Sequence, residues 1–237
     1  MRKYQAQKKN KTFRKDRVFK SLIFCFFLFM FFISSGFCKN EIFNIGRLKY
    51  SGGGDWYSNP SSLPNLQREL GKITSMSIGK HDITVSLKDN SVHSTPVIYM
   101  TGHGNVRFSK EEANNLRAYL KSGGFLWADD NYGMDESFRK QMKVVFPAKD
   151  LTKIPVTHKI FKSPYPMAKG LPKIHEHHGG PPEAYGIFID GRLAVFYSYN
   201  TDIGDGLEDG DVHGDSVAKR MAALQMAINI IVHALGH

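Results

Sequence analysis

Two short apolar runs, with a helical pattern between them, define the centre of this sequence. The runs lie within residues 96–101 and 125–128, and continuous apolar runs of this length are typical of strands covered on both faces of a sheet. Between them, Ser109 and Glu112 have the spacing of a capping box, which predicts a helix whose apolar face consists of Ala113, Leu116 and Leu120. Gly123-Gly124 predicts the end of that helix. This strand–helix–strand order is typical of a parallel crossover in an α/β sheet.

Weaker patterns before and after this unit predict further elements. Residues 42–50 and 82–87 are expected to form strands, and residues 63–73 a helix. A further helix is predicted from Asp135, which we expect to cap it, to about Val145. The sheet therefore gains at least two strands on the N-terminal side of the central crossover.

The last third of the chain predicts a hairpin and a long helix. Strands at 184–189 and 193–199 flank Asp190-Gly191, which is a strong signal for a tight antiparallel turn. Residues 217–235 predict an amphipathic helix whose buried face we expect to consist of Met221, Leu224, Ile228, Ile231 and Leu235. The proline-rich residues 147–184 are expected to be irregular. The expected fold is α/β, with a mostly parallel sheet and one antiparallel hairpin.

The first 38 residues predict an export signal. A basic stretch is followed by the apolar run 21–33 and by the small residues Ser34, Ser35 and Gly36, which is the order of a secretory signal peptide. The run is shorter than the roughly 20 apolar residues of a full membrane span. Two interpretations are open: cleavage after Cys38, or an uncleaved N-terminal anchor that is the chain's only membrane contact. Either places residues 41–237, expected to be a single domain, in the periplasm or cell envelope.

Charge and cysteine content narrow the functional classes. The chain carries a net charge of +10, but nine of its 32 Lys and Arg residues and only one of its 22 Asp and Glu residues lie in residues 1–20. The remaining 23 basic and 21 acidic residues nearly cancel, so a nucleic-acid partner is not expected for the domain. Both cysteines, Cys25 and Cys38, lie in the N-terminal segment. The domain after residue 38 therefore has no thiol nucleophile, cysteine zinc site or internal disulfide.

Polar and glycine-rich loops follow several of the predicted strands. In open α/β sheets, ligands bind beyond the carboxyl ends of the strands, so these loops predict a common site. Asp129 and Asp130 follow a buried strand, and two adjacent carboxylates there predict a raised pKa for one of them and a role as acid or base. The residues expected to bind a ligand are Gly53, Asp55, Trp56, His103, Asn105, Tyr132 and Glu176.

A histidine cluster lies in the proline-rich segment. His175 and His177 point the same way in an extended chain, so both imidazoles could contact one ligand or one metal ion. Three interpretations are open: a divalent-metal site, a polar or catalytic loop, and a surface loop. The acidic residues farther along fail the EF-hand pattern, because the twelfth position counted from Asp209 is Arg220. Most of that stretch is expected to be a solvated loop: Asp202, Asp205, Glu208, Asp209, Asp211 and Asp215.

Five motifs carry a resemblance to a known family. They are LKYSGGGDWY (48–57), TGHGN (101–105), ADDNYGMDESF (128–138), LPKIHEH (171–177) and FYSY (196–199). Through these motifs the chain resembles the bacterial domain-of-unknown-function family 4159 (DUF4159). The resemblance covers nearly all of residues 44–237. This family has no established activity to carry over.

The resemblance also implies a finer fold and an altered site. It implies a flavodoxin-like three-layer αβα sandwich of the class I glutamine amidotransferase-like group, closest to its ThuA-like branch. Amidotransferases place a nucleophilic cysteine at the turn that corresponds to Asp129-Asp130, so glutaminase activity is not expected. By analogy alone, the region of His175 and His177 corresponds to their catalytic histidine.

These observations lead to two hypotheses of function. In the first, the exported domain binds a small polar ligand, such as a carbohydrate or an envelope fragment, and Asp129, Asp130, His175 and His177 perform acid–base or metal-assisted hydrolysis. In the second, the domain is a non-catalytic binding or scaffold module of the envelope, in which Trp56 and Tyr132 stack on a ligand or partner. The sequence leaves open whether the chain is an enzyme, and it identifies no protein partner.

Overall fold

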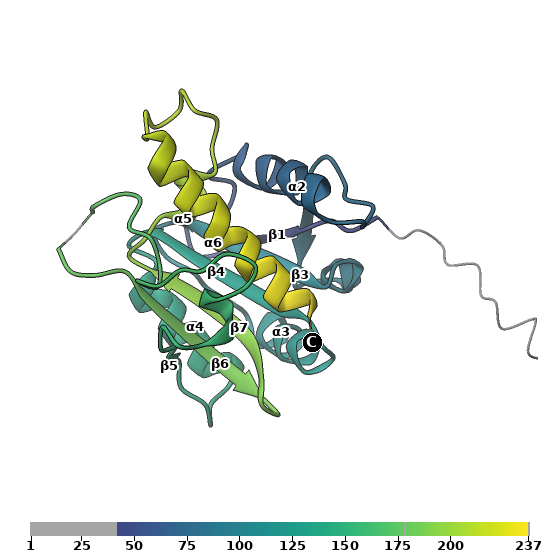
Figure 1. Ribbon diagram of the computed structural model, residues 1–237. Helices are drawn as coiled ribbons and strands as arrows, with labels where there is room; N and C mark the ends of the chain where they lie inside the picture. The colour runs from purple at the N-terminus through teal and green to yellow at the C-terminus, as the bar shows by residue number, and fades with distance from the viewer. Residues whose placement is uncertain (1–41, 178, 237) are drawn as a thin grey trace, which may run out of the picture. The chain divides into compact units, whose positions relative to one another are not determined.

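A seven-stranded sheet forms the centre of the computed structural model, which describes residues 42–177 and 179–236 (Figure 1). The strand order is β2-β1-β3-β4-β7-β6-β5. Neighbours from β2 to β7 pair in parallel, whereas β6 pairs antiparallel with both β7 and β5. The strands are β1 (Gly46–Lys49), β2 (Ile83–Ser86), β3 (Val97–His103), β4 (Phe125–Tyr132), β5 (Thr152–Lys153), β6 (Glu183–Ile189) and β7 (Arg192–Tyr199).

Helices cover both faces of this sheet. Helix α6 (Val217–Leu235) crosses one face with α2 (Ser62–Ile73) beside it, and α3 (Lys110–Lys121) and α4 (Asp135–Val145) lie on the other (Figure 1). The short helix α5 (Ile203–Gly206) follows β7, and two 3-10 turns, η1 (Asn90–Ser94) and η2 (Lys159–Phe161), complete the elements. The predicted mixed α/β fold with a mostly parallel sheet is confirmed. Within the described residues no helix is long and apolar enough to span a membrane, and the predicted signal or anchor lies outside them.

The strands have two apolar faces because successive side chains point to opposite sides. Tyr99 and Trp127 pack under α2 and α6, with ring centroids 4.7 Å apart, whereas Ile98 and Leu126 pack under α3 and α4. All four are fully buried, and burying one such side chain contributes about 1.5–3 kcal/mol. The central strands are therefore held from both sides, and their carboxyl ends form a rigid edge.

Local signals in the sequence placed several elements correctly. The backbone N–H of Glu112 donates to Ser109 Oγ at 3.1 Å, and the Ser109 N–H donates back to Glu112 Oε2 at 2.7 Å, so the predicted capping box starts α3. Asp190 and Gly191 have φ values of 50° and 81°, the left-handed conformation of a tight hairpin turn. The parallel crossover β3-α3-β4 is also confirmed.

Three predicted details are wrong. Strand β4 continues to Tyr132, because the ladder to β3 extends through Asp129 and Asp130 instead of ending at Ala128. Helix α4 has Met134 at its N-cap, and Asp135 is its first residue. Met221 remains 48% exposed, because it lies near the start of α6 beside a groove between that helix and α2.

Candidate functional site

Two segments meet beyond the carboxyl ends of β4 and β7. The segment that carries the predicted histidines is fastened to the segment after β7 by a 2.9 Å bond from Ile174 N–H to Thr201 O. Lys173 Nζ donates to Asn200 Oδ1 at 2.5 Å, and the Thr201 hydroxyl donates to Pro172 O. These bonds place the imidazoles against the acidic residues that follow Thr201.

His175 lies between two carboxylates. Its Nδ1 is 2.9 Å from Asp205 Oδ2, and its Nε2 is 2.9 Å from Asp215 Oδ2. The other oxygen of Asp205 accepts a 2.7 Å bond from Asn59 Nδ2, and His213 Nε2 lies 3.9 Å from Asp205 Oδ2. The ring of His175 is thus held in orientation from both nitrogens.

Asp202 is a buried carboxylate without a hydrogen-bond donor. Its side chain is 1% exposed, and within residues 42–177 and 179–236 neither of its oxygens accepts a hydrogen bond. His177 Nε2 lies 2.5 Å from its Oδ2, without the alignment of a hydrogen bond. Burial, then the charges of Asp129 and Asp205, raises the pKa of Asp202 to about 9, while the weaker influence of Lys173 opposes the rise. Burial is also the main cause that lowers the pKa of His177.

Asp129 is a third carboxylate near Asp202 and Asp205, and it is fully buried. Its two oxygens accept hydrogen bonds from the Ser198 hydroxyl at 2.5 Å and from Gly204 N–H at 2.7 Å. Burial raises the pKa of Asp129 to about 7 against the opposing effect of these bonds, and Asp130 contributes least to the rise. The predicted raised pKa is therefore present, but burial causes it more than repulsion within the Asp pair does.

Asp130 faces the opposite side of the sheet, because neighbouring residues of a strand alternate in direction. It lines a cavity of about 330 Å³ at the end of β4 and accepts a 3.2 Å bond from Met134 N–H. Two predicted residues share this cavity: Tyr132, which is half exposed, and His177, with ring centroids 5.1 Å apart. The full lining is Asp130, Asn131, Tyr132, Gly133, Asp135, Glu136, His177, Tyr199 and Asn200.

Other predicted ligand-binding residues lie on a neighbouring pair of loops, which a 3.3 Å bond from Gly104 N–H to Tyr132 O joins to the end of β4. His103 Nδ1 lies 3.1 Å from Asp55 Oδ2, and Gly54 N–H donates to Asn105 O at 3.0 Å. Trp56 packs partly buried, with Lys49 Nζ 5.4 Å from its ring centroid. Asp55, His103 and Asn105 therefore take part in joining the loops after β1 and β3, whereas Gly53 and Glu176 are exposed to solvent.

The acidic stretch after β7 was only partly predicted correctly. Asp209 and Asp211 are exposed, as a solvated loop requires, but Asp202, Asp205, Glu208 and the side chain of Asp215 are buried. Sequence reasoning also missed Asn59 and Ser198, which bond to Asp205 and Asp129. The available signal was the position of Asp202 at the exit of β7, next to a strand that carries Asp129 and Asp130 near its carboxyl end.

Two groups of side chains have the geometry to hold a metal ion. In each group three ligand atoms lie within 4.8 Å of one another: His175, His177 and Asp202 in one, and His175, Asp205 and His213 in the other. His175 belongs to both. His175 is partly buried, whereas Glu176 and His177 are exposed, so these groups lie at the surface of the domain.

Comparison with known proteins gives a family without a known activity. The sequence model of the family described as "Domain of unknown function (DUF4159)" matches residues 44–235. No curated protein matches the chain.

Proposed function

The chain belongs to the DUF4159 family, and from the geometry of its site we propose that it is an exported hydrolase that binds a small polar ligand, a carbohydrate or cell-envelope fragment, at the end of β4. The proposal includes a flavodoxin-like, amidotransferase-like fold. Supporting observations are the helices on both faces of the sheet and the histidine segment above the carboxyl ends of its strands. Because the domain contains no cysteine, the chemistry proposed is not that of a glutaminase.

The cavity at the end of β4 carries this proposal. Its wall combines a half-exposed aromatic ring, Tyr132, with the carboxylate of Asp130 and the amide of Asn200. A flat aromatic face packs against the C–H surface of a sugar, while carboxylate and amide groups bond its hydroxyls. A volume of about 330 Å³ suits a ligand of one or two sugar rings.

Asp130 is the residue we assign to proton transfer. Hydrolysis needs a group that takes a proton from water and returns one to the leaving oxygen, and a carboxylate within reach of the ligand can do both. Asp129 is excluded from this role because its side chain is on the opposite face of β4 and fully buried. Asp129 instead holds Gly204 and Ser198 in place.

A non-catalytic binding domain is the second candidate. The bond from Met134 N–H to Asp130 Oδ1 favours it, because a carboxylate that satisfies the backbone at the start of α4 has a structural role of its own. The cavity would then bind the same class of ligand without turning it over.

The substitution Asp130→Asn separates the two candidates. Asparagine keeps an oxygen for Met134 N–H but loses the charge, so the fold and binding should persist while cleavage is lost. Chito-oligosaccharides and soluble muropeptides are suitable probes, with calorimetry for binding and mass spectrometry for cleavage. Tyr132→Ala should weaken binding at least tenfold, and Asp190→Asn, in the hairpin turn at the far end of β7, should change neither.

Each outcome of this experiment decides between the candidates. Cleavage by the wild type that Asp130→Asn abolishes supports the hydrolase. Binding without cleavage by either protein supports the non-catalytic domain. A wild type that binds none of the probes overturns the proposed ligand class.

A further inference from the structure

We propose that His175, His177 and Asp202 form a binding site for one divalent transition-metal ion, with zinc as the best match. The site does not depend on the ligand proposed for the neighbouring cavity. It joins the histidine segment before β6 to the acidic segment after β7, two parts of the chain that are 25 or more residues apart.

The spacing of His175, His177 and Asp202 fits a single ion, because one ligand atom of each lies within 4.8 Å of the other two. In a tetrahedral zinc site with bonds of about 2.0–2.1 Å, the ligand atoms lie about 3.3 Å from one another. Here His177 Nε2 is 2.5 Å from Asp202 Oδ2, and His175 Nδ1 is 3.8 Å from that oxygen and 2.9 Å from Asp205 Oδ2. The two separations from Asp202 Oδ2 bracket the value for a shared ion, so small side-chain adjustments would bring His175, His177 and Asp202 onto one ion.

The oxygens of Asp202 point to a ligand that the protein itself does not supply. Buried polar atoms in folded proteins have hydrogen-bond partners, and exceptions call for an explanation. Both oxygens of Asp202 lack one across the described parts of the chain, although the side chain is almost fully buried. The approach of His177 Nε2 to Oδ2 without hydrogen-bond alignment is the arrangement of two groups that face a common ion.

The charge of the region also calls for a cation. Asp129, Asp202 and Asp205 are buried, and no Lys or Arg of residues 42–177 and 179–236 forms an ion pair with any of them. Buried carboxylates are costly unless a positive charge pairs with them. A divalent ion bound at Asp202 would offset the charge of that carboxylate directly and weaken its repulsion from the other two.

Two further residues have the geometry of an outer shell. Histidines that bind metals through one nitrogen usually donate the other N–H to a carboxylate, which fixes the ring. His175 directs Nδ1 toward Asp202 and Asp205, and Asp215 accepts at its Nε2, 2.9 Å away. Asn59 Nδ2 bonds the outer oxygen of Asp205 at 2.7 Å. Hydrogen bonds from outside the site therefore hold its side chains in orientation, and an accidental cluster of acidic residues lacks such bonds.

The backbone around the site has unusual conformations. Four described residues other than glycine have a positive φ, and three of them, Asn59, Asn200 and Asp202, surround the site, each at 57°. Such conformations persist where the surrounding structure imposes them, and they concentrate at functional sites. At Asp202 this conformation belongs to the segment that carries the carboxylate toward His177.

The mixture of ligands selects the kind of ion. Two imidazoles with one carboxylate suit zinc and its first-row neighbours, whereas calcium and magnesium prefer sites made of oxygen alone. His177 also lines the cavity that contains Asp130. The ion would therefore lie beside the proposed ligand site and be reachable from it.

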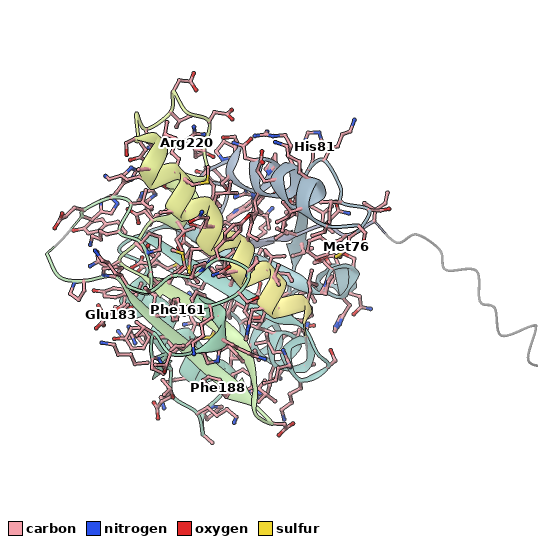
Figure 2. All side chains as sticks on the ribbon, in the orientation of Figure 1. Met76, His81, Phe161, Glu183, Phe188 and Arg220 are labelled. Atoms are coloured by element: carbon pink, nitrogen blue, oxygen red, sulfur yellow. The ribbon has the colours of Figure 1, made fainter. Side chains whose placement is uncertain are left out.

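Zinc titration of the untagged full chain, after treatment with a chelator, tests this site. Calorimetry and elemental analysis should give one equivalent of zinc, and cobalt should give the visible absorption of a four-coordinate ion. Asp202→Asn and His177→Gln should each weaken zinc binding at least tenfold. The matched control is His81→Gln, an exposed histidine beside α2 (Figure 2).

A stability measurement distinguishes loss of the ion from loss of the fold. Asparagine adopts a positive φ readily, so Asp202→Asn keeps the backbone and removes a buried charge. Its melting temperature in chelator should exceed that of the wild type, and zinc should raise the melting temperature of the wild type alone. His177 is a third exposed, so His177→Gln provides a folded variant in any case.

The proposal is overturned if the wild type binds no zinc or if both variants bind it as tightly as the wild type. Either result would leave ligand binding in the β4 cavity untouched, because that is measured with the sugar probes alone. Lost zinc binding in both variants, with wild-type binding in His81→Gln, supports the site.

Discussion

Ser198 and Asp129 occupy facing positions on the neighbouring parallel strands β7 and β4, and the serine hydroxyl donates a 2.5 Å hydrogen bond to the carboxylate. The same hydroxyl oxygen accepts a 3.0 Å bond from Trp127 Nε1. A line of hydrogen bonds therefore runs from the apolar core to the acidic edge of the sheet. At its end the pKa of Asp129 is about 7, because burial outweighs the two donors.

The raised pKa of Asp129 predicts that this residue lowers stability as the pH rises. An unfolded Asp has a pKa near 3.8, so between about pH 4 and 7 the folded state holds a proton that the unfolded state has lost. The stability that comes from this proton is present below pH 4 and disappears as the pH passes 7. Asp129→Asn should remove this decrease in stability at high pH. At pH 8, in the presence of chelator, the variant should therefore unfold at a higher urea concentration than the wild type. The gain is a few kcal/mol at most, since one pKa unit corresponds to about 1.4 kcal/mol.

Asp129→Asn and the wild type should be compared at pH 8 and at pH 5, together with a control variant. At pH 5 the advantage of Asp129→Asn should shrink but persist, because the folded wild-type carboxyl is then protonated while the unfolded one is mostly ionised. Asp190→Asn, at the exposed hairpin turn, should follow the wild type at both pH values. Equal urea midpoints for Asp129→Asn and the wild type at pH 8 would show that the carboxyl is not destabilising when ionised.

Gly204 is predicted to be irreplaceable for steric reasons. A Cβ at this position would lie 2.4 Å from Tyr99 Oη and 2.6 Å from Asn59 Nδ2, well inside van der Waals contact. Gly204→Ala should therefore cost about 1–3 kcal/mol in unfolding free energy and displace Asn59 from Asp205. Thermal unfolding measures the cost.

The control for this substitution is Gly179→Ala. A Cβ there meets no atom within 4 Å, so stability should change by less than about 0.5 kcal/mol. If both variants unfold at the wild-type temperature, the close packing around Gly204 is not rigid in solution.

Local rules were sufficient to predict much of the fold. The capping box at Ser109, the turn at Asp190-Gly191 and the apolar runs of β3 and β4 depend on neighbours in sequence, and all are found in the structure. The end of β4 was missed because its last residues are polar. Asp129 and Asp130 remain in the strand because ladder bonds to β3 and buried polar partners replace the apolar packing that the pattern looks for.

Local sequence patterns predicted the site less well than they predicted the fold. His175 and His177 were expected to share one direction, and both do approach Asp202. The burial of Asp202 and Asp205 depends on contacts with residues far away in sequence, such as Asn59, which is 146 positions from Asp205. No local pattern carries that information, so an acidic loop that folds inward has the same local sequence as one that is solvated.

The capping box offers a test of stability that leaves the site intact. Ser109→Ala removes the oxygen that accepts from Glu112 N–H, and loss of such a cap costs about 1 kcal/mol. We expect a lower melting temperature and unchanged zinc binding, since α3 covers the face of the sheet opposite α6. Ser75→Ala, at an exposed position after α2, is the control and should have no effect on either measurement. Loss of zinc binding in Ser109→Ala would indicate that α3 contributes to the site.

Asp215 is predicted to act on the metal through His175. Its Oδ2 accepts from His175 Nε2 at 2.9 Å, and its own side chain is 7% exposed. Removing such an outer carboxylate from a metal-bound histidine typically lowers affinity 10–100-fold, because the ring loses its orientation and some basicity. Asp215→Ala should therefore weaken zinc binding within this range, and Asp215→Asn, which keeps an acceptor for the N–H group, should weaken it less.

A nearby carboxylate in the same loop provides the control, and the Asn and Ala variants of Asp215 provide the comparison. Asp211→Ala removes an exposed carboxylate four residues earlier and should leave the zinc affinity unchanged. A purely electrostatic role would make Asp215→Asn as harmful as Asp215→Ala, because both lose the charge. A positioning role predicts the order wild type, Asn, Ala in zinc affinity at one pH and ionic strength. Calorimetric titrations of the four proteins establish that order, and equal affinity for wild type and Asp215→Ala would remove Asp215 from the site.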